Sequence, residues 1–271
     1  KVFHFRTHPR NIKVLTAASI SQVCLANNHI LDYEFEGMFQ TIDILKENGV
    51  NFAGVGENVA TASMPAITKV NKQTIGLISF TDNEPPWEAT DKRPGVYYTP
   101  IDLKDARAKH VFQTVEKAIK MVDFLIVSPH WGPNWGYDPP SEHISFAHKL
   151  IDHGADVVFG HSGHIFRGIE LYNGKPIFYC AGDFINDYSI DELERNDQGF
   201  IYTLETEGKN ITRITLYPTL IREFQAMLAR EFEAKEIIEK MAQLCFDFYT
   251  PTFFNPALQT LEIPITNEEH T

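Results

Sequence analysis

Three segments of the sequence place asparagine or histidine directly after an apolar run. They read VCLANNH at residues 23–29, FLIVSPHWG at 124–132 and DVVFGHSGH at 156–164. Each run is rich in β-branched or aromatic residues, as in a buried strand. Amide and imidazole groups in such a place cost free energy unless a partner satisfies them. The residues to be explained are Asn28, His29, His130, His161 and His164.

These side chains have the chemistry of a metal-dependent hydrolase. Functional groups gather at the carboxyl ends of strands in open α/β sheets, so three parallel strands separated by helices would bring all five into one crevice. Imidazoles with an amide oxygen suit divalent Mn, Fe or Zn. A pair of such metals activates water and holds both ends of a phosphoryl displacement. A loop histidine bonded to backbone is the alternative for any one residue, but recurrence at three strand ends favours the metal site.

Several nearby residues are weaker candidates, and each has a structural alternative. Asp32 either orients His29 through a carboxylate–imidazole hydrogen bond or caps the following helix. Trp131 and Trp135 either wall the substrate pocket or belong to the core. Arg167, three residues after His164, is the nearest anion clamp.

Two further groups follow strand ends. Asp82 and Asn83, with Trp87, are expected to line the rim of the same pocket. The stretch CAGDFINDY either supports the metal ligands or forms an Asx-rich turn, and it contains Asp183, Asn186 and Asp187. A helical segment carries three histidines five residues apart, which therefore do not share a face and are expected to be solvated: His143, His148 and His153.

Composition limits the function classes. The chain has 271 residues and a formal net charge of −12, so its surface repels phosphate backbones and nucleic acid is not an expected partner. A polyanionic substrate is repelled equally unless the site is locally positive, which a metal centre would provide. The 3 cysteines form no CxxC or CxxH pair, which excludes a zinc knuckle. No apolar run reaches the roughly 18 residues of a membrane helix, and no signal peptide is visible.

Helix and strand patterns alternate over residues 1–165, after which hairpins dominate. Asn173-Gly174 between two apolar runs predicts one such hairpin. A helix is expected at 103–122 and a final one at about 224–244. The pattern predicts one α/β domain over residues 1–245, with parallel strands first and antiparallel strands later, and an irregular C-terminal tail over 246–271.

Five motifs resemble a known family. LANNHILDY, TDNEPPWEA, SPHWGPNW, GADVVFGHSGHIFRGIELYNGKPIFY and GDFINDY look like the capsule-synthesis family named for CapA, associated with poly-γ-glutamate capsules. The likeness runs from the first residue to the last predicted helix. That family is similar to the calcineurin-like metallophosphatases. The resemblance therefore implies a four-layer α/β/β/α sandwich, here without its first strand, and a dinuclear metal site.

The resemblance also implies residue roles. Asn28 corresponds to the metal-binding Asn of the phosphatase Gly-Asn-His motif, and His29 to the catalytic His that contacts phosphate or protonates the leaving group. His130 and His161 would join Asn28 around one metal. His164 would serve the other, although GHSGH is one residue longer than the phosphatase GHxH motif.

One departure from the family bears on the metal content. The family opens with a strand ending in Gly-Asp and a later Asn-Leu-Glu-like segment, and neither precedes LANNH in this sequence. Without a bridging carboxylate, two divalent cations at close range repel each other. The resemblance implies two divalent ions (Mn, Fe or Zn) in a complete member and predicts one or none in this chain.

The resulting hypothesis is a CapA-like protein with a phosphoesterase-type hydrolase site, in which Asp32 assists His29. Two alternatives stay open: hydrolysis of γ-glutamyl amide bonds, and a non-catalytic assembly or export factor. The expected partners are an anionic small molecule or polymer and a membrane-bound capsule synthesis complex. The expected location is the bacterial cell envelope or extracytoplasmic space, and the cytoplasm stays open because no signal is visible.

Overall fold

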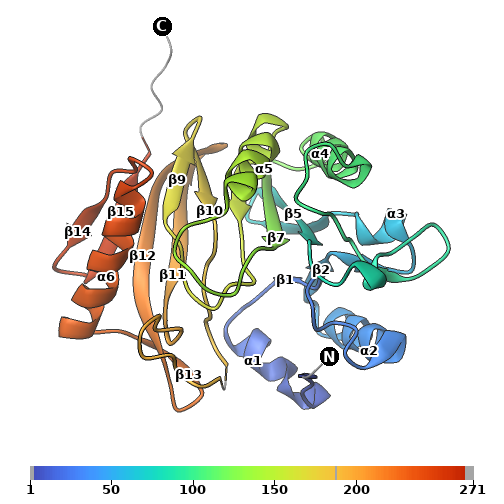
Figure 1. Ribbon diagram of the computed structural model, residues 1–271, viewed down its shortest axis with the longest axis horizontal. Coiled ribbons are helices and arrows are strands. Elements are labelled where there is room, and N and C mark those ends of the chain that lie inside the picture. The colour runs from blue at the N-terminus through green and yellow to red at the C-terminus, as the bar shows by residue number, and fades with distance from the viewer. Residues whose placement is uncertain (1–2, 187, 266–271) are drawn as a thin grey trace, which may run out of the picture. The chain divides into compact units, whose positions relative to one another are not determined.

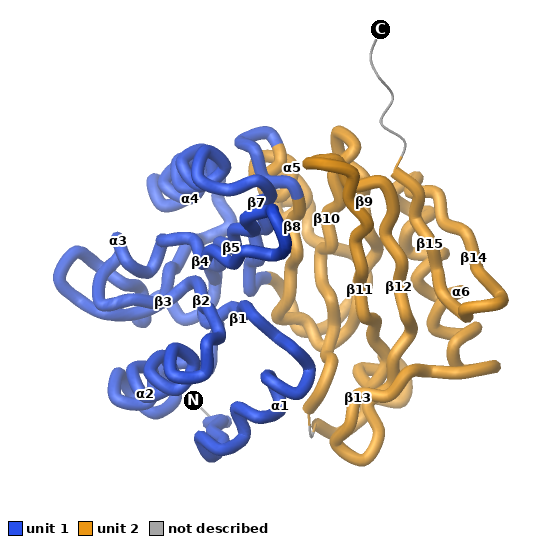
Figure 2. Tube along the Cα trace, turned by 180° about the vertical axis from the view of Figure 1, so that it is seen from behind, with its two compact units in different colours: residues 1–131, 152–156 blue, residues 132–151, 157–271 orange. Residues whose placement is uncertain are grey.

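The computed structural model describes residues 3–186 and 188–265 of the chain (Figure 1). They divide into two compact units (Figure 2): unit 1 contains residues 1–131 and 152–156, and unit 2 contains 132–151 and 157–271. Helices and strands alternate in sequence, which confirms the predicted α/β class. The division falls inside the 1–245 segment, for which one domain stays a prediction.

Unit 1 carries the N-terminal alternation of helices and strands. Its elements are η1 (Pro9–Asn11), α1 (Ile12–Ala17), β1 (Gln22–Cys24), α2 (Glu34–Glu47), β2 (Asn51–Ala53), β3 (Val55–Gly56), α3 (Val59–Ala62), β4 (Ala66–Val70), β5 (Gln73–Thr81), η2 (Pro85–Trp87), β6 (Gly95–Val96), α4 (Ala106–Ala118) and β7 (Phe124–His130).

The described strands of unit 1 belong to three sheets, and the largest of these is six-stranded. Within the described residues, β1 and β2 make a two-stranded parallel sheet, whereas β5 pairs with β4 antiparallel and with β7 in parallel. The sequence analysis placed the strand before Asn28 in one sheet with the strand before His130, and this was wrong. Gln22, the first residue of β1, donates its side-chain amide to the carbonyls of Ala66 in β4 (3.1 Å) and Ile75 in β5 (3.3 Å). These contacts of Gln22 with β4 and β5 are thus side-chain hydrogen bonds and not the backbone hydrogen bonds of a shared sheet.

The buried face of α2 anchors the end of β1. Met38, Ile42 and Leu45 are buried in a cluster that also contains Leu25 and Leu31, one on each side of the Asn27–His29 turn. The helix starts without a side-chain cap at Tyr33. Because aliphatic side chains on both sides of the turn are buried, the polar residues between them are held in a fixed place.

Unit 2 contains most of the antiparallel structure. Its elements are α5 (Ser141–Asp152, whose last residue belongs to unit 1), β8 (Val157–Phe159), β9 (Ile169–Tyr172), β10 (Lys175–Phe178), β11 (Gln198–Glu207), β12 (Asn210–Arg222), β13 (Gln225–Leu228), α6 (Glu231–Phe246), β14 (Phe253–Asn255) and β15 (Thr260–Pro264). The β9–β10 hairpin confirms the prediction at Asn173-Gly174, where both residues have positive φ, 51° and 71°.

The C-terminal region differs from the predicted pattern. The expected helix at 224–244 begins only at Glu231, because Gln225–Leu228 pairs with β12 after a turn with positive φ at Glu223 and Phe224. The expected irregular tail contains β14 and β15 in the sheet of β11 and β12, with Leu261 and Ile263 buried. Two alternating aliphatic residues were enough to add a strand.

Two other features complete the fold. The amphipathic helix expected at 103–122 is shorter, because Asp105 caps it by accepting from the Arg107 N–H. Among the described residues, no helix combines the length and apolar character needed to cross a bilayer.

A substitution at Gly95 tests how closely this residue packs against the backbone of residues 87–89. A Cβ on Gly95 would lie 2.1 Å from the Trp87 carbonyl oxygen and 2.9 Å from the Ala89 nitrogen. We expect Gly95→Ala to lower the free energy of unfolding by about 3 kcal/mol, because backbone atoms must move to admit the methyl group.

Urea unfolding of the full chain measures this loss. Gly174→Ala is the control: open space surrounds its Cβ, so only the positive φ opposes the substitution, with a loss of about 1 kcal/mol. Equal losses in the two variants would contradict the packing shown by the structure.

Candidate functional site

An Asx turn directs His29 at the end of β1. The Asn27 Oδ1 accepts hydrogen bonds from the backbone N–H groups of His29 (2.9 Å) and Ile30 (2.8 Å). This turn reverses the chain just after the strand, as Asn side chains commonly do. The sequence analysis assigned a role to Asn28 and missed Asn27, although two consecutive asparagines after a strand were the visible signal. Asn28 itself is half-buried.

His29 and Asp32 form a tight hydrogen-bonded pair. The His29 Nδ1 lies 2.6 Å from the Asp32 Oδ2, and the Asp32 side chain is 0% exposed while that of His29 is 29% exposed. The same oxygen accepts from the Phe5 N–H at 2.9 Å, and the Phe5 ring meets the His29 ring edge-on at 4.4 Å. Of the two roles left open for Asp32, the structure shows the contact with His29.

The pair fixes the tautomer of His29. An ionised carboxylate only accepts hydrogen bonds, so the Nδ1 carries the proton that Asp32 binds. The Nε2 is then the nitrogen through which His29 can act on another group. A carboxylate that holds one imidazole nitrogen and leaves the other available is the arrangement of a general acid or base.

The carboxyl ends of β5 and β7 lie in register. Thr81 is opposite His130, and the Thr81 hydroxyl and the Asp82 N–H both donate to the His130 carbonyl, at 3.0 and 3.3 Å. The Asn83 amide donates to the Asp82 Oδ1 at 2.7 Å. Asp82 and Asn83 therefore follow β5 beside the buried His130, as the strand-end argument expected.

Trp131 is part of the hydrophobic core. It is 1% exposed and its ring packs edge-on against Phe80 at 6.4 Å. The prediction that Trp131 binds substrate is corrected: the residue after β7 is a core residue, which was the stated alternative.

In unit 2, His164 pairs with a carboxylate distant in sequence. Its Nδ1 lies 3.1 and 3.2 Å from the two carboxylate oxygens of Asp183, and the Asn186 amide donates to the same group. The ring also contacts Trp135 at 5.5 Å and Tyr188 edge-on at 4.9 Å. Of the two roles left open for Asp183, the contact with His164 corresponds to support of a predicted metal ligand. Asp187 lies outside the described residues.

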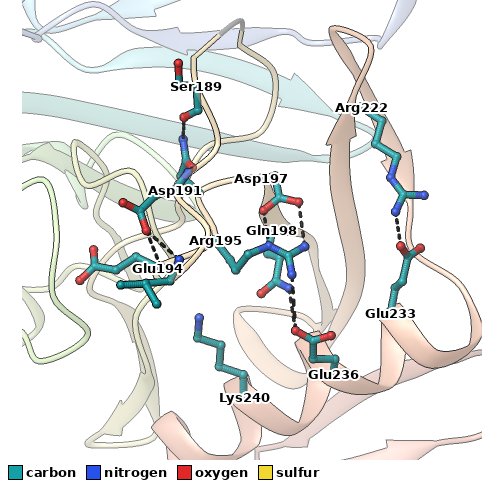
Figure 3. Close-up of polar contacts among 12 residues, drawn as sticks. Ser189, Asp191, Glu194, Arg195, Asp197, Gln198, Arg222, Glu233, Glu236 and Lys240 are labelled. Atoms are coloured by element: carbon teal, nitrogen blue, oxygen red, sulfur yellow. Dashed lines mark hydrogen bonds and ion pairs between the residues drawn. The ribbon is translucent and has the colours of Figure 1, made fainter.

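The loop after Asp183 is fixed by its own polar groups (Figure 3). The Asp191 Oδ1 accepts from the backbone N–H groups of Leu193 and Glu194. Arg195 binds Asp197 with two nitrogens, at 2.8 and 2.9 Å, and reaches Glu236 of α6 at 3.6 Å. These contacts tie the turn around Arg195 to α6.

His161 has the electrostatics of a neutral ligand. Desolvation lowers the pKa of His161 to about 4, so its imidazole is uncharged at neutral pH. A neutral imidazole is the form that binds a cation. The following residue, Ser162, has φ of 112°, so the chain turns sharply immediately after His161.

Arg167 is structural and not an exposed anion clamp. It is 1% exposed, and its guanidinium donates to the carbonyls of Gly136 (2.9 Å), Pro133 (2.9 Å) and Trp135 (3.3 Å). The donors that an anion would need are used to hold the 133–136 loop. The sequence could not reveal this, because the acceptors are main-chain atoms about 30 residues away.

The three histidines of the α5 region are not simply solvated, which corrects that expectation. His143 is buried. His148 lies 2.9 Å from Glu170 and stacks on Tyr172 at 3.8 Å. His153 lies 2.8 Å from Glu116. Each has a structural partner or a buried position, so none adds to the candidate site.

The metal prediction is supported in part. Asn28, His29 and His130 belong to unit 1, and His161 and His164 to unit 2. Within residues 3–186 and 188–265, no three His, Cys, Asp or Glu side chains form a group able to hold an ion. The surroundings of His164 suit a metal ligand, because a carboxylate holds its Nδ1, as is common for histidines that bind metals.

Comparison with known proteins places the chain among capsule proteins. Residues 1–188 match the family described as bacterial capsule synthesis protein PGA_cap. The chain is 34% identical over 238 residues to the "Probable polyglutamine synthesis accessory protein" of Mycobacterium tuberculosis, covering 83% of this chain and 62% of that protein. It is 32% identical over 189 residues to the "PGA biosynthesis protein CapA" of Bacillus subtilis, covering 69% of this chain and 48% of that protein.

Among solved structures, the chain is similar to a phosphatase from Mycoplasma pneumoniae. The TM-score is 0.43 with 11% identity, over 78% of this chain and 69% of the other. At this identity the likeness concerns the backbone alone. The chain spans about three fifths of the length of the mycobacterial relative and about half that of the Bacillus protein.

The role of Arg167 can be tested by a conservative change. Arg167→Lys keeps the charge but loses the planar guanidinium, whose Nε and Nη2 donate to these carbonyls from two separate positions. We expect the free energy of unfolding to fall by about 1.5–3 kcal/mol, because buried carbonyls lose charge-assisted hydrogen bonds. Urea unfolding checks the loss. Unchanged stability together with weaker phosphate binding would restore the anion-clamp assignment.

Proposed function

Because the chain belongs to the bacterial capsule synthesis protein family PGA_cap, we propose that it serves the biosynthesis of a poly-γ-glutamate-type capsule polymer in the cell envelope. Its own reaction is hydrolysis of a phosphoester-type bond. The observation that carries the reaction is the His29–Asp32 pair, in which a fully buried carboxylate holds one nitrogen of a partly exposed imidazole at 2.6 Å.

The proposed reaction uses His29 as the general acid. Water attacks phosphorus, the bond from phosphorus to the leaving oxygen breaks, and the His29 Nε2–H gives its proton to that oxygen. Asp32 stabilises the imidazolium before the transfer and keeps the ring oriented. The Phe5 ring packs on one side of the imidazole and limits its rotation. The attacking water loses its proton to solvent, so charge and atoms balance.

A divalent ion, when bound, would supply Lewis acidity and an activated water. His164 is the described residue best prepared to hold it, through Nε2, with Asp183 on the opposite nitrogen. The family resemblance assigns Asn28, His130 and His161 to a different ion from the one that His164 would serve.

Activity measurements test the role of the pair. We expect His29→Ala to lower kcat for bis(p-nitrophenyl) phosphate about 10²–10⁴-fold, because the proton donor is lost. Asp32→Asn should lower it less, because the imidazole stays but its charged form loses its partner.

His148→Ala is the matched control. His148 is also a histidine paired with a carboxylate, that of Glu170. Its replacement by alanine should leave turnover unchanged. Hydrolysis that survives His29→Ala would contradict the proposal.

Metal affinity tests the second pair. Asp183→Asn removes the carboxylate behind His164, and we expect the affinity of the full chain for Mn²⁺ to fall about 10–100-fold in isothermal titration calorimetry. Asp191→Asn, in the same loop, removes a turn-forming carboxylate and should leave the affinity unchanged. Equal affinities for wild type and Asp183→Asn would exclude His164 as a supported ligand.

A second candidate function is a non-catalytic accessory role. The mycobacterial relative is named an accessory protein, and unit 2 exposes large aromatic side chains: Phe224 is 71%, Phe232 75% and Tyr249 91% exposed. Such residues are typical of surfaces that bind another protein. Absence of hydrolysis of phosphoester and γ-glutamyl amide substrates, together with binding to a capsule synthesis complex, would favour this role.

A further inference from the structure

Unit 1 contains a cleft that neither the proposed reaction nor the family match assigns. Its volume is about 320 Å³, at the lower end of the roughly 300–1,000 Å³ typical of small-molecule sites. The apolar part of its wall comes from Leu31, Phe35, Pro86 and Trp87, and the polar part from His4, Asp32 and Glu34.

The cleft adjoins the proposed acid. Asp32 lines the cleft and also holds the Nδ1 of His29 at 2.6 Å. His29 is not among the lining residues, and Asp32 holds its Nδ1, so the cleft lies on the Asp32 side of the pair. The link to the acid rests on the proposed function, whereas the chemistry of the cleft walls does not.

The aromatic walls are held in place by different elements. Trp87 ends η2 and packs against the core cluster that contains Leu31 and Val96, so its indole position is fixed. Phe35 stands in the first turn of α2 and is 39% exposed. Aromatic faces attract cations through their quadrupole.

The charges of the cleft favour the same kind of ligand. Two of its polar lining residues, Asp32 and Glu34, are carboxylic acids. The Asp32 carboxylate is 0% exposed and held by His29, so Glu34 is the lining carboxylate that attracts cations and repels anions in the cleft. The first turn of α2 does not compensate, because Glu34 and Glu36 already complement the positive end of the helix dipole. His4 is the one lining group that can carry a positive charge.

We propose that this cleft binds a primary ammonium group attached to a short apolar or aromatic body. Trp87 and Phe35 contact the body and the cation, and Glu34 pairs with the ammonium. Glu34 is then a specificity-determining residue: it selects the charge of the group bound, without taking part in proton transfer.

Binding of three probes of similar shape to the full chain tests the proposal without turnover. The probes are benzylammonium, benzyl alcohol and benzoate, followed by the Trp87 indole N–H in ¹⁵N NMR, a signal identified by its loss in Trp87→Phe. We expect benzylammonium to bind about threefold to tenfold more tightly than benzyl alcohol, and benzoate to bind weakest.

Paired charge variants locate the effect. Glu34→Gln should remove the preference for benzylammonium over benzyl alcohol. Glu36→Gln changes the net charge equally, lies in the same helical turn and is not a lining residue, so it should keep the preference. Equal effects of the two variants, tightest binding of benzoate, or no shift with any probe would overturn the proposal.

The test separates this inference from the proposed function. Binding of benzylammonium with no hydrolysis of any phosphoester would retain the cleft and reject the reaction. Hydrolysis that depends on His29 without charge-selective binding at Trp87 would retain the reaction and reject the cleft.

Discussion

The buried carboxylate of Asp32 is the constraint on which the candidate site depends. A carboxylate that is 0% exposed must be paired and hydrogen-bonded, because an isolated buried charge is too costly. Here the imidazole of His29 and the N–H of Phe5 supply the partners, both on one oxygen. The burial of Asp32 thus determines the tautomer of His29, the path of the chain at Phe5 and the position of the cleft wall.

The two histidine–carboxylate pairs of the candidate site are built in different ways. His29 and Asp32 are three residues apart, and the Asn27 turn brings them together locally. His164 and Asp183 are 19 residues apart, and the β9–β10 hairpin lies between them in sequence. The local pair depends on one turn. The distant pair depends on a hairpin and on the polar contacts that hold the following loop to α6.

This difference explains how much could be predicted from the sequence. The His29–Asp32 contact and the Asn173-Gly174 hairpin were readable because turn chemistry acts over a few residues. The contacts of Arg167 were not, since its acceptors are carbonyls whose positions follow from tertiary packing. The placement of β1 in its own sheet was missed for the same reason: an apolar run predicts a strand but not its neighbour. The capsule family was recognisable from its motifs, because several short motifs in order are more specific than any periodicity.

The acidity of the chain restricts which substrate the site can meet. A formal net charge of −12 and a cleft lined by Asp32 and Glu34 disfavour a polycarboxylate segment beside His29. A small ligand with a cationic end meets this condition, because Glu34 attracts a positive charge into the cleft. An anionic polymer would need a cationic surface elsewhere or a bound metal. The charges of unit 1 therefore favour a small cationic ligand over a segment of an anionic polymer at this cleft.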